Sequence, residues 1–125
     1  MHSDYQGNKK KRIGLSYALA GIRYAILTEW NLRIHVIAFI SVMILSAFLK
    51  ISMLEWVSVI IISGLVLITE MLNTSLEHLL DYLAPEWHPE VGKIKDMMAG
   101  TVFIAALLAI IVGTIIFLPK LMAFF

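Results

Sequence analysis

The chain has 125 residues, of which 60% are hydrophobic and 15% are charged, and its formal net charge is only +1. Its mean hydropathy of +0.87 is too high for a soluble domain of this length and predicts an all-α membrane protein built as one domain, residues 1–125. Cysteine is absent, which excludes disulfides and thiolate metal sites.

Residues 13–28 have the pattern of an amphipathic helix. Apolar side chains recur at helical spacing, at Leu15, Ala18, Leu19, Ile22 and Ile26. A second stripe is polar and basic and consists of Lys9, Arg12, Ser16 and Arg23. The pattern predicts a surface helix over about residues 9–28, lying on an anionic membrane face. A basic cluster that merely orients the chain would explain Lys9 to Arg12, but not Arg23.

Three apolar runs follow, at residues 34–49, 56–76 and 97–118. With a rise of about 1.5 Å per residue and a hydrocarbon core of about 30 Å, they predict transmembrane helices over about 33–50, 54–83 and 90–119. The first run spans only if Arg33 and Lys50 extend their side chains outward. Pro85 and Pro89 break the chain between the last two helices, and Pro89 suits a helix start.

The basic residues are distributed unevenly about these spans. Eight of the ten Lys and Arg residues fall before the first span or between the second and third, and only Lys50 and Lys120 fall on the other side. Because Lys and Arg are enriched in cytoplasmic segments, we expect a multi-pass protein with its N-terminus inside and its C-terminus outside.

The second span ends in a polar stripe, EMLNTSLEHLLD, at residues 70–81. At about 100° per residue, its polar side chains fall within an arc of roughly 100°. They are Glu70, Asn73, Thr74, Glu77 and Asp81. Counted from Trp56 at the outer interface, Glu70 lies roughly 9 Å beneath the inner surface, where an unpaired carboxylate costs about 2.5 kcal/mol or more. A polar seam between helices would explain Asn73 and Thr74, whereas several carboxylates favour a functional site that binds a cation such as Mg²⁺.

A second polar cluster is expected beside this stripe. An antiparallel hairpin centred on Glu86 brings Glu77 level with Lys95, and Asp96 adds another carboxylate. Glu29, just ahead of the first span, lies at the same interface. Phosphoryl transfer needs carboxylates for a divalent ion, a cation for phosphates and a group that takes the hydroxyl proton, and the deeper carboxylate can serve as that group.

The run EMLNTSLEHLLD followed by GKIKDMMAG closely resembles the signature of the prokaryotic diacylglycerol kinase family, which includes undecaprenol kinases. The resemblance extends from the surface helix to the C-terminus. It implies an enzyme that transfers a phosphoryl group from ATP to the primary hydroxyl of a membrane lipid, at the cytoplasmic face of the bacterial inner membrane. It also implies a homotrimer with sites shared between neighbouring subunits. No nucleic-acid partner is expected.

The resemblance assigns roles to particular residues. Glu70 resembles the catalytic base, and Glu29 with Glu77 resembles the pair that holds the Mg²⁺ of MgATP. The nucleotide is expected to contact Lys10, Tyr17, Glu29, Glu77, Glu86, Trp87, His88, Lys95 and Asp96. Asn73 and Asp81 are expected as polar residues of the active centre. The lipid substrate is expected to contact Arg23, Asn31, Arg33, His35, Glu70 and Ala99.

Two positions depart from the pattern of other members. Lys10 stands where some members carry Arg, and His35 stands where diacylglycerol-specific members have Glu. The E-x-N-x-x-x-H run that starts at Glu29, the EHxxD spacing and the IIFLPKL segment look more like the undecaprenol kinase branch. Undecaprenol is therefore favoured over diacylglycerol as the acceptor lipid.

Two other classes of function fit parts of the pattern. A proton or cation pathway would need polar residues that continue from Glu70 to the outer surface, but that half of the span offers only small hydroxyls and a glycine. A non-catalytic assembly module would use buried polar groups to specify oligomers, but it would need neither Glu29 nor the pair Lys95 and Asp96.

Overall fold

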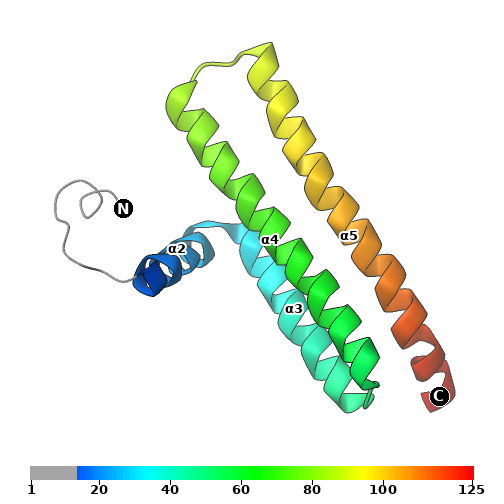
Figure 1. Ribbon diagram of the computed structural model, residues 1–125. Helices are drawn as coiled ribbons and strands as arrows, with labels where there is room; N and C mark the ends of the chain where they lie inside the picture. Colours follow the sequence, from blue (N-terminus) through cyan, green and yellow to red (C-terminus); the bar gives the residue numbers. More distant parts are fainter. Residues whose placement is uncertain (1–13) are drawn as a thin grey trace.

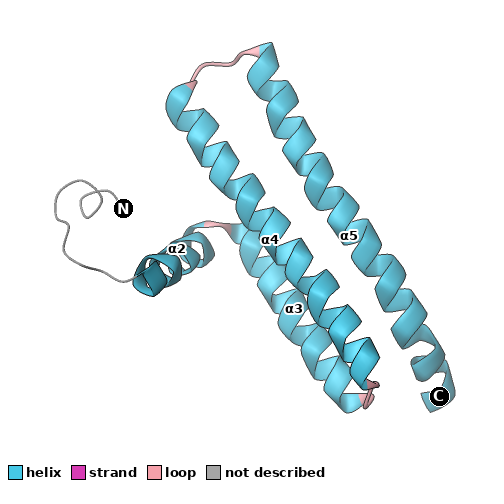
Figure 2. Cartoon of the chain, viewed as in Figure 1, coloured by secondary structure: helices cyan, strands magenta, loops and turns pink. Residues whose placement is uncertain are grey.

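The computed structural model describes residues 14–125, and all of the regular structure in them is helical (Figure 2). The helices are α2 (Gly14–Thr28), α3 (Trp30–Phe48), α4 (Met53–Leu83) and α5 (Pro89–Phe124). The all-α prediction is confirmed over these residues. The first part of the predicted surface helix, including Lys10, lies outside the described residues.

Helices α3, α4 and α5 are long and apolar enough to cross a membrane, and they match the three predicted spans. They run side by side, with α4 antiparallel to both neighbours (Figure 1). Helix α4 packs more extensively against α5 than against α3, while α2 contacts α3 and turns away from the bundle. Many large apolar side chains face outward, as expected where lipid replaces water.

An apolar cluster joins the three long helices at one end of the bundle. We call this end, where residues 49–52 connect α3 to α4, the turn end, and the opposite end, where residues 84–88 connect α4 to α5, the loop end. The buried members of the cluster are Ile51, Val59, Ile116 and Phe117. Partly buried Val42, Met43, Leu45, Leu49, Trp56, Val112 and Leu121 pack against them. Van der Waals packing therefore holds the helices together at the turn end.

The buried residues of α4 become polar towards the loop end. Thr69, Glu70, Asn73 and Thr74 are each at most 9% exposed. Since Asn73 and Thr74 follow Glu70 by about one helical turn, these side chains share the face of α4 that its neighbours cover. The interior of the bundle is thus apolar at the turn end and polar nearer the loop end.

A capping box starts α4 at the turn end. The Ser52 hydroxyl accepts a hydrogen bond from the Glu55 backbone N–H (3.2 Å), and the Glu55 carboxylate accepts one from the Ser52 backbone N–H (2.9 Å). The same carboxylate forms an ion pair of 3.2 Å with Lys120 on α5. Lys50, in the preceding turn, has a left-handed backbone with a φ of 52°, which helps to reverse the chain. Polar contacts therefore fix the register of α4 and α5 at this end.

The junction between α2 and α3 falls at Glu29, whose backbone is extended (φ −112°, ψ 114°). The guanidinium of Arg33 folds back onto the end of α2. Its Nε donates to the carbonyl oxygen of Ile26 at 2.8 Å, and its Nη2 donates to that of Leu27 at 3.0 Å. It also lies 5.7 Å from the centre of the Trp30 ring. Arg33 thus satisfies carbonyls near the end of α2 and fixes the junction.

Two helix boundaries differ from the predicted ones. Helix α3 begins at Trp30 instead of about residue 33, because the extended backbone of Glu29 already separates it from α2. Helix α5 continues to Phe124 instead of ending near residue 119. Pro119 lies inside α5 and cannot donate to the carbonyl oxygen of Ile115 one turn earlier, yet the helix continues past it for little more than one turn.

Candidate active site

Glu70 lies at the centre of the polar interior. The residue is 4% exposed, and its neighbours in space come from α3 as well as from α4. Its carboxyl group is therefore enclosed by protein instead of pointing into the acyl chains of a bilayer. An enclosed acid inside an apolar helix is rarely retained without a partner or a function.

Polar groups of α4 surround this carboxyl. Thr74 lies one turn beyond Glu70 and its hydroxyl is close to the carboxyl group. The hydroxyl of Thr69 donates to the Val66 carbonyl oxygen at 3.0 Å and is thus satisfied within the helix. The Oδ1 atom of Asn73 is buried and has no hydrogen-bond partner among the described residues. Because buried amide oxygens are normally bonded, Asn73 marks a place where a donor group can bind.

Helix α3 contributes His35 to the same place. The Nε2 atom of His35 lies 3.6 Å from Oε1 of Glu70, which is longer than a hydrogen bond but well within electrostatic range. The side chain of His35 is 27% exposed, whereas that of Glu70 is 6% exposed. His35 therefore connects the enclosed carboxyl to the outside of the bundle.

Glu29 is held by a histidine of α4. The Nε2 atom of His78 lies 2.8 Å from Oε2 of Glu29. The ring of Tyr24 on α2 meets the His78 ring edge to face, with the centroids 6.2 Å apart. Together these contacts join α2 and the junction at Glu29 to α4, next to Glu77.

The predicted metal ligands, Glu29 and Glu77, lie near Glu70, and the charges of both act on its carboxyl. In the part of the chain from residue 14 onward, no three His, Asp or Glu side chains gather into a complete metal site. Mg²⁺ bound with a nucleotide takes only one or two carboxylates and completes its shell with phosphates and water. Among these residues Glu77 forms no ion pair, and His78 contacts only one oxygen of Glu29. The donor set thus fits Mg²⁺ carried by ATP.

Lys95 connects α5 to α4 closer to the loop end. Its Nζ lies 2.7 Å from Oδ1 of Asp81. Glu77, which the sequence predicted to lie level with Lys95, is within electrostatic range of the ammonium. The ammonium reaches one turn beyond Glu77 because a lysine side chain is long enough to do so. Asp96, the next residue, is exposed. The Lys95 ammonium is therefore paired with Asp81 and lies within electrostatic range of Glu77 at the edge of the site.

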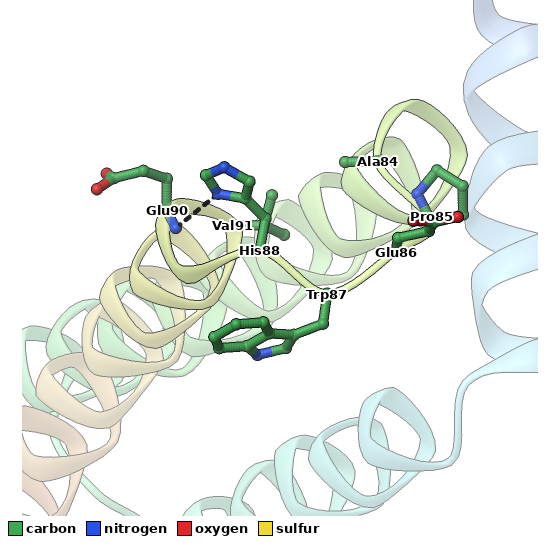
Figure 3. A pocket seen from close by; sticks show the side chains of 7 residues that line it. All are labelled: Ala84, Pro85, Glu86, Trp87, His88, Glu90 and Val91. Atoms are coloured by element: carbon green, nitrogen blue, oxygen red, sulfur yellow. Dashed lines mark hydrogen bonds between the residues drawn. The ribbon is translucent and has the colours of Figure 1, made fainter.

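The connection between α4 and α5 forms an open hollow at the loop end (Figure 3). It is lined by Ala84, Pro85, Glu86, Trp87, His88, Glu90 and Val91. His88 caps α5, since its Nδ1 accepts a hydrogen bond from the Glu90 backbone N–H at 3.1 Å, and Pro89 is the first residue of the helix, as predicted. Trp87 is 82% exposed. The predicted nucleotide segment thus lies about 20 Å from Glu70 along α4.

The remaining predicted site residues are not gathered around Glu70. Arg23 on α2, Asn31 on α3 and Ala99 on α5 are exposed. Tyr17 is half exposed on α2. The guanidinium of Arg33, predicted to contact lipid, is engaged by the carbonyl groups of α2. The site within one chain therefore consists mainly of α4 with its neighbours from α3 and α5.

Neither His78 nor Tyr24 was predicted from the sequence as a site residue. His78 follows Glu77 directly, but its partner Glu29 is 49 positions away along the chain, so no local spacing joins them. The only signal was the position of His78 within the polar end of the second span.

Comparisons with known proteins identify the family to which this sequence is related. The family model described as Prokaryotic diacylglycerol kinase matches residues 16–117. The undecaprenol kinase of Bacillus subtilis (strain 168) is 34% identical over 123 residues, which cover 97% of this chain and 100% of that protein. The diacylglycerol kinase of Synechocystis sp. is 37% identical over 112 residues, 89% of this chain and 64% of that protein. That of Escherichia coli (strain K12) is 30% identical over 100 residues, 80% of this chain and 82% of that protein.

The fold and the site define a small helical membrane protein with an enclosed acid beside a charged surface region. The chain belongs to the prokaryotic diacylglycerol kinase family, as the resemblance predicted. It is a membrane lipid kinase. This membership favours a catalytic role over the ion pathway and the assembly module.

Proposed function

We propose that the chain transfers the γ-phosphoryl group of ATP to the primary hydroxyl of a membrane lipid, which yields the lipid phosphate and ADP. The observation that carries this proposal is the enclosed carboxyl of Glu70, beside the unsatisfied oxygen of Asn73. The lipid approaches laterally from the bilayer, and ATP approaches from the water at the loop end. The two substrates meet where the interior of the bundle changes from apolar to polar.

Glu70 acts as the general base. Its carboxyl oxygen accepts the hydroxyl proton as the lipid oxygen forms its bond to phosphorus. The amide of Asn73 offers a donor and an acceptor beside this carboxyl and can orient the hydroxyl. Asp81 contributes to the active centre through its hold on Lys95. Enclosure keeps bulk water from competing with the lipid as the acceptor.

The nucleotide is bound by groups nearer the loop end. The ammonium of Lys95 leaves Asp81 to meet a phosphate, and Asp96 lies beside it. Further contacts come from Lys10, Tyr17, Glu86, Trp87 and His88. Because phosphoryl transfer depends mainly on positioning and on neutralised charge, this cluster supplies what the reaction requires.

Mg²⁺ enters with ATP and would be held by Glu29 and Glu77. When bound, it neutralises charge on the phosphoryl group that is transferred. His78 holds Glu29 in place through Oε2. This assignment is supported by the position of both carboxylates near Glu70.

The loop end faces the cytoplasm of a bacterium, and the protein lies in the inner membrane with its N-terminus inside and its C-terminus outside. The asymmetric distribution of Lys and Arg supports this orientation, since Lys93 and Lys95 lie at the loop end and Lys50 and Lys120 at the turn end. Helix α2 lies on the cytoplasmic surface as the amphipathic helix.

The working form is a homotrimer in which neighbouring subunits share sites. Three spans enclose little interior, and many large apolar side chains remain at the surface of the single chain. Arg23, Asn31 and Ala99 are expected to contact the lipid, yet they face outward. In the trimer, these residues of one subunit would lie beside the Glu70 of a neighbouring subunit.

Undecaprenol is the proposed acceptor, and diacylglycerol is the alternative. A relative whose full length is matched by this chain is named an undecaprenol kinase, and His35 agrees with that branch. Other relatives are named diacylglycerol kinases. Both lipids present a primary hydroxyl at the interface, so the chemistry at Glu70 is the same.

Parallel assays with the two lipids test this proposal. Purified protein in bilayers, supplied with ATP and Mg²⁺, should phosphorylate undecaprenol with a kcat/KM about tenfold or more above that for diacylglycerol. Formation of lipid phosphate is measured directly, and membranes without either lipid serve as the blank. A preference for diacylglycerol would show that diacylglycerol, not undecaprenol, is the acceptor. If neither lipid gave lipid phosphate, the kinase proposal would be refuted.

A further inference from the structure

The proposed reaction leaves a proton on Glu70 after each turnover, and this inference rests on that proposal. The residue is 4% exposed, so bulk water has little direct access to its carboxyl. The carboxyl must return to its base form before the next lipid hydroxyl reacts. An enclosed general base therefore needs a second group that carries its proton outward.

His35 is placed to be that group. Its Nε2 lies 3.6 Å from Oε1 of Glu70, and within residues 14–125 no other Lys, Arg or His nitrogen lies within 4.0 Å of this carboxyl. The side chain of His35 is 27% exposed, and it extends from α3, not from the helix that carries Glu70. Histidine side chains gain and lose protons near neutral pH, which suits a group that must do both in every cycle.

The other neighbours of Glu70 do not offer this route. Thr69 and Thr74 carry hydroxyls that do not titrate in the neutral range, and the amide of Asn73 does not titrate either. The titratable groups that face the carboxyl from α4 and from the junction are Glu77 and Glu29. Glu29 is hydrogen-bonded to His78, and in the proposed reaction both carboxylates hold the Mg²⁺ of ATP, so their oxygens would not be open to the proton from Glu70.

The contact between His35 and Glu70 is also not locked. A separation of 3.6 Å exceeds a hydrogen bond, so a small side-chain movement or one water molecule completes the path. A contact of this length lets a proton pass without a fixed hydrogen bond that would hold Glu70 in one charge state.

We propose that His35 is the proton exit of the site, a residue that acts through Glu70 and does not touch the transferred phosphoryl group. In the first step the lipid O–H bond breaks and its proton binds Glu70, while the lipid oxygen bonds to the γ-phosphorus of ATP. The bond between that phosphorus and the bridging oxygen breaks, and ADP leaves with its electron pair. In the second step the proton moves from Glu70 to Nε2 of His35. The imidazolium then releases a proton to water, and both side chains are restored.

Rapid-mixing measurements on His35→Gln test the exit directly. Glutamine keeps a polar group near Glu70 but cannot carry the proton. At saturating lipid, where a weaker lipid contact does not limit the rate, we expect the first turnover at each site to stay close to the wild-type rate and later turnovers to slow about tenfold or more. Lipid phosphate then forms in a burst of one per site. A merely structural defect would slow the first turnover as well, and that result, or an unchanged steady rate, would overturn the proposal.

Chemical rescue provides the second measurement. In His35→Ala, imidazole added to the buffer should raise the steady rate in proportion to its concentration. The wild type should not respond, and neither should Ser41→Ala, which changes an exposed residue further along α3. Absence of rescue in His35→Ala together with a wild-type steady rate would also overturn the exit role. An inactive wild type would instead refute the proposed kinase reaction.

Discussion

The imidazole Nε2 of His78 lies 2.8 Å from Oε2 of Glu29 and thereby joins the junction of α2 and α3 to α4. Because Glu29 is a proposed Mg²⁺ ligand, His78 fixes the orientation of that carboxylate. Changing a residue that orients a ligand typically weakens metal binding at least tenfold. His78→Ala should therefore raise the Mg²⁺ concentration for half-maximal activity by about tenfold.

His78→Gln is the matched variant, since its amide can still donate to Glu29. It should need much less additional Mg²⁺ than His78→Ala. Equal Mg²⁺ requirements for His78→Ala and the wild type would contradict the orienting role.

A substitution at Arg33 distinguishes a structural role at the end of α2 from a role in binding the lipid substrate. Its Nε and Nη2 donate to two carbonyl oxygens at the end of α2 from one rigid plane, whereas lysine has a single nitrogen on a flexible chain. Arg33→Lys should destabilise the docking of α2 by about 1 kcal/mol, and backbone amides near residues 24–33 should exchange hydrogen faster. The KM for lipid should change little. A large rise in that KM without faster exchange would assign Arg33 to the substrate instead.

Lys95 and Asp81 are paired at 2.7 Å, yet we expect their replacement to have unequal effects. Lys95→Ala removes the cation for the phosphates and should raise the KM for ATP by about tenfold or more. Asp81→Asn removes only the partner, so the KM for ATP should change far less. Because the pair is largely exposed, neither change should shift the thermal midpoint appreciably. Equal effects on the KM for ATP would show that the pair acts as one unit.

The capping box at the turn end allows stability to be separated from activity. Ser52→Ala removes the hydroxyl that accepts from the Glu55 N–H and should cost about 1 kcal/mol of stability. Turnover below the unfolding temperature should remain unchanged, since the site lies towards the other end of the bundle. Thermal unfolding of the protein in bilayers measures the first effect. A loss of turnover equal to that of a site variant would contradict this separation.

The sequence predicted the arrangement of the spans because apolar runs of sufficient length leave few alternatives in a bilayer. It also grouped Glu70 with Asn73 and Thr74 on one side of the second span by helical periodicity, and the structure shows that this side is covered. The start of α5 followed from Pro89, whose missing N–H is harmless there. These features depend on residues that are close together in the chain.

Features that depend on distant residues were harder to predict. The contact of His78 with Glu29 requires the angle between α2 and α3, which Arg33 sets from inside the next helix. Likewise, Lys95 was aligned with Glu77 by counting, whereas its long side chain reaches Asp81. A residue's place on a helix can thus be predicted from the sequence, but the direction in which a long, flexible side chain extends cannot.

The most direct test of the central claim is lipid phosphorylation by Glu70→Gln in bilayers. Glutamine keeps the size and polarity of the side chain but cannot accept the hydroxyl proton, so turnover should fall about a hundredfold or more with helix content unchanged. Glu55→Gln at the turn end is the matched control and should retain turnover, because glutamine also supports a capping box. If Glu70→Gln phosphorylated lipid at the wild-type rate, Glu70 would not be the base.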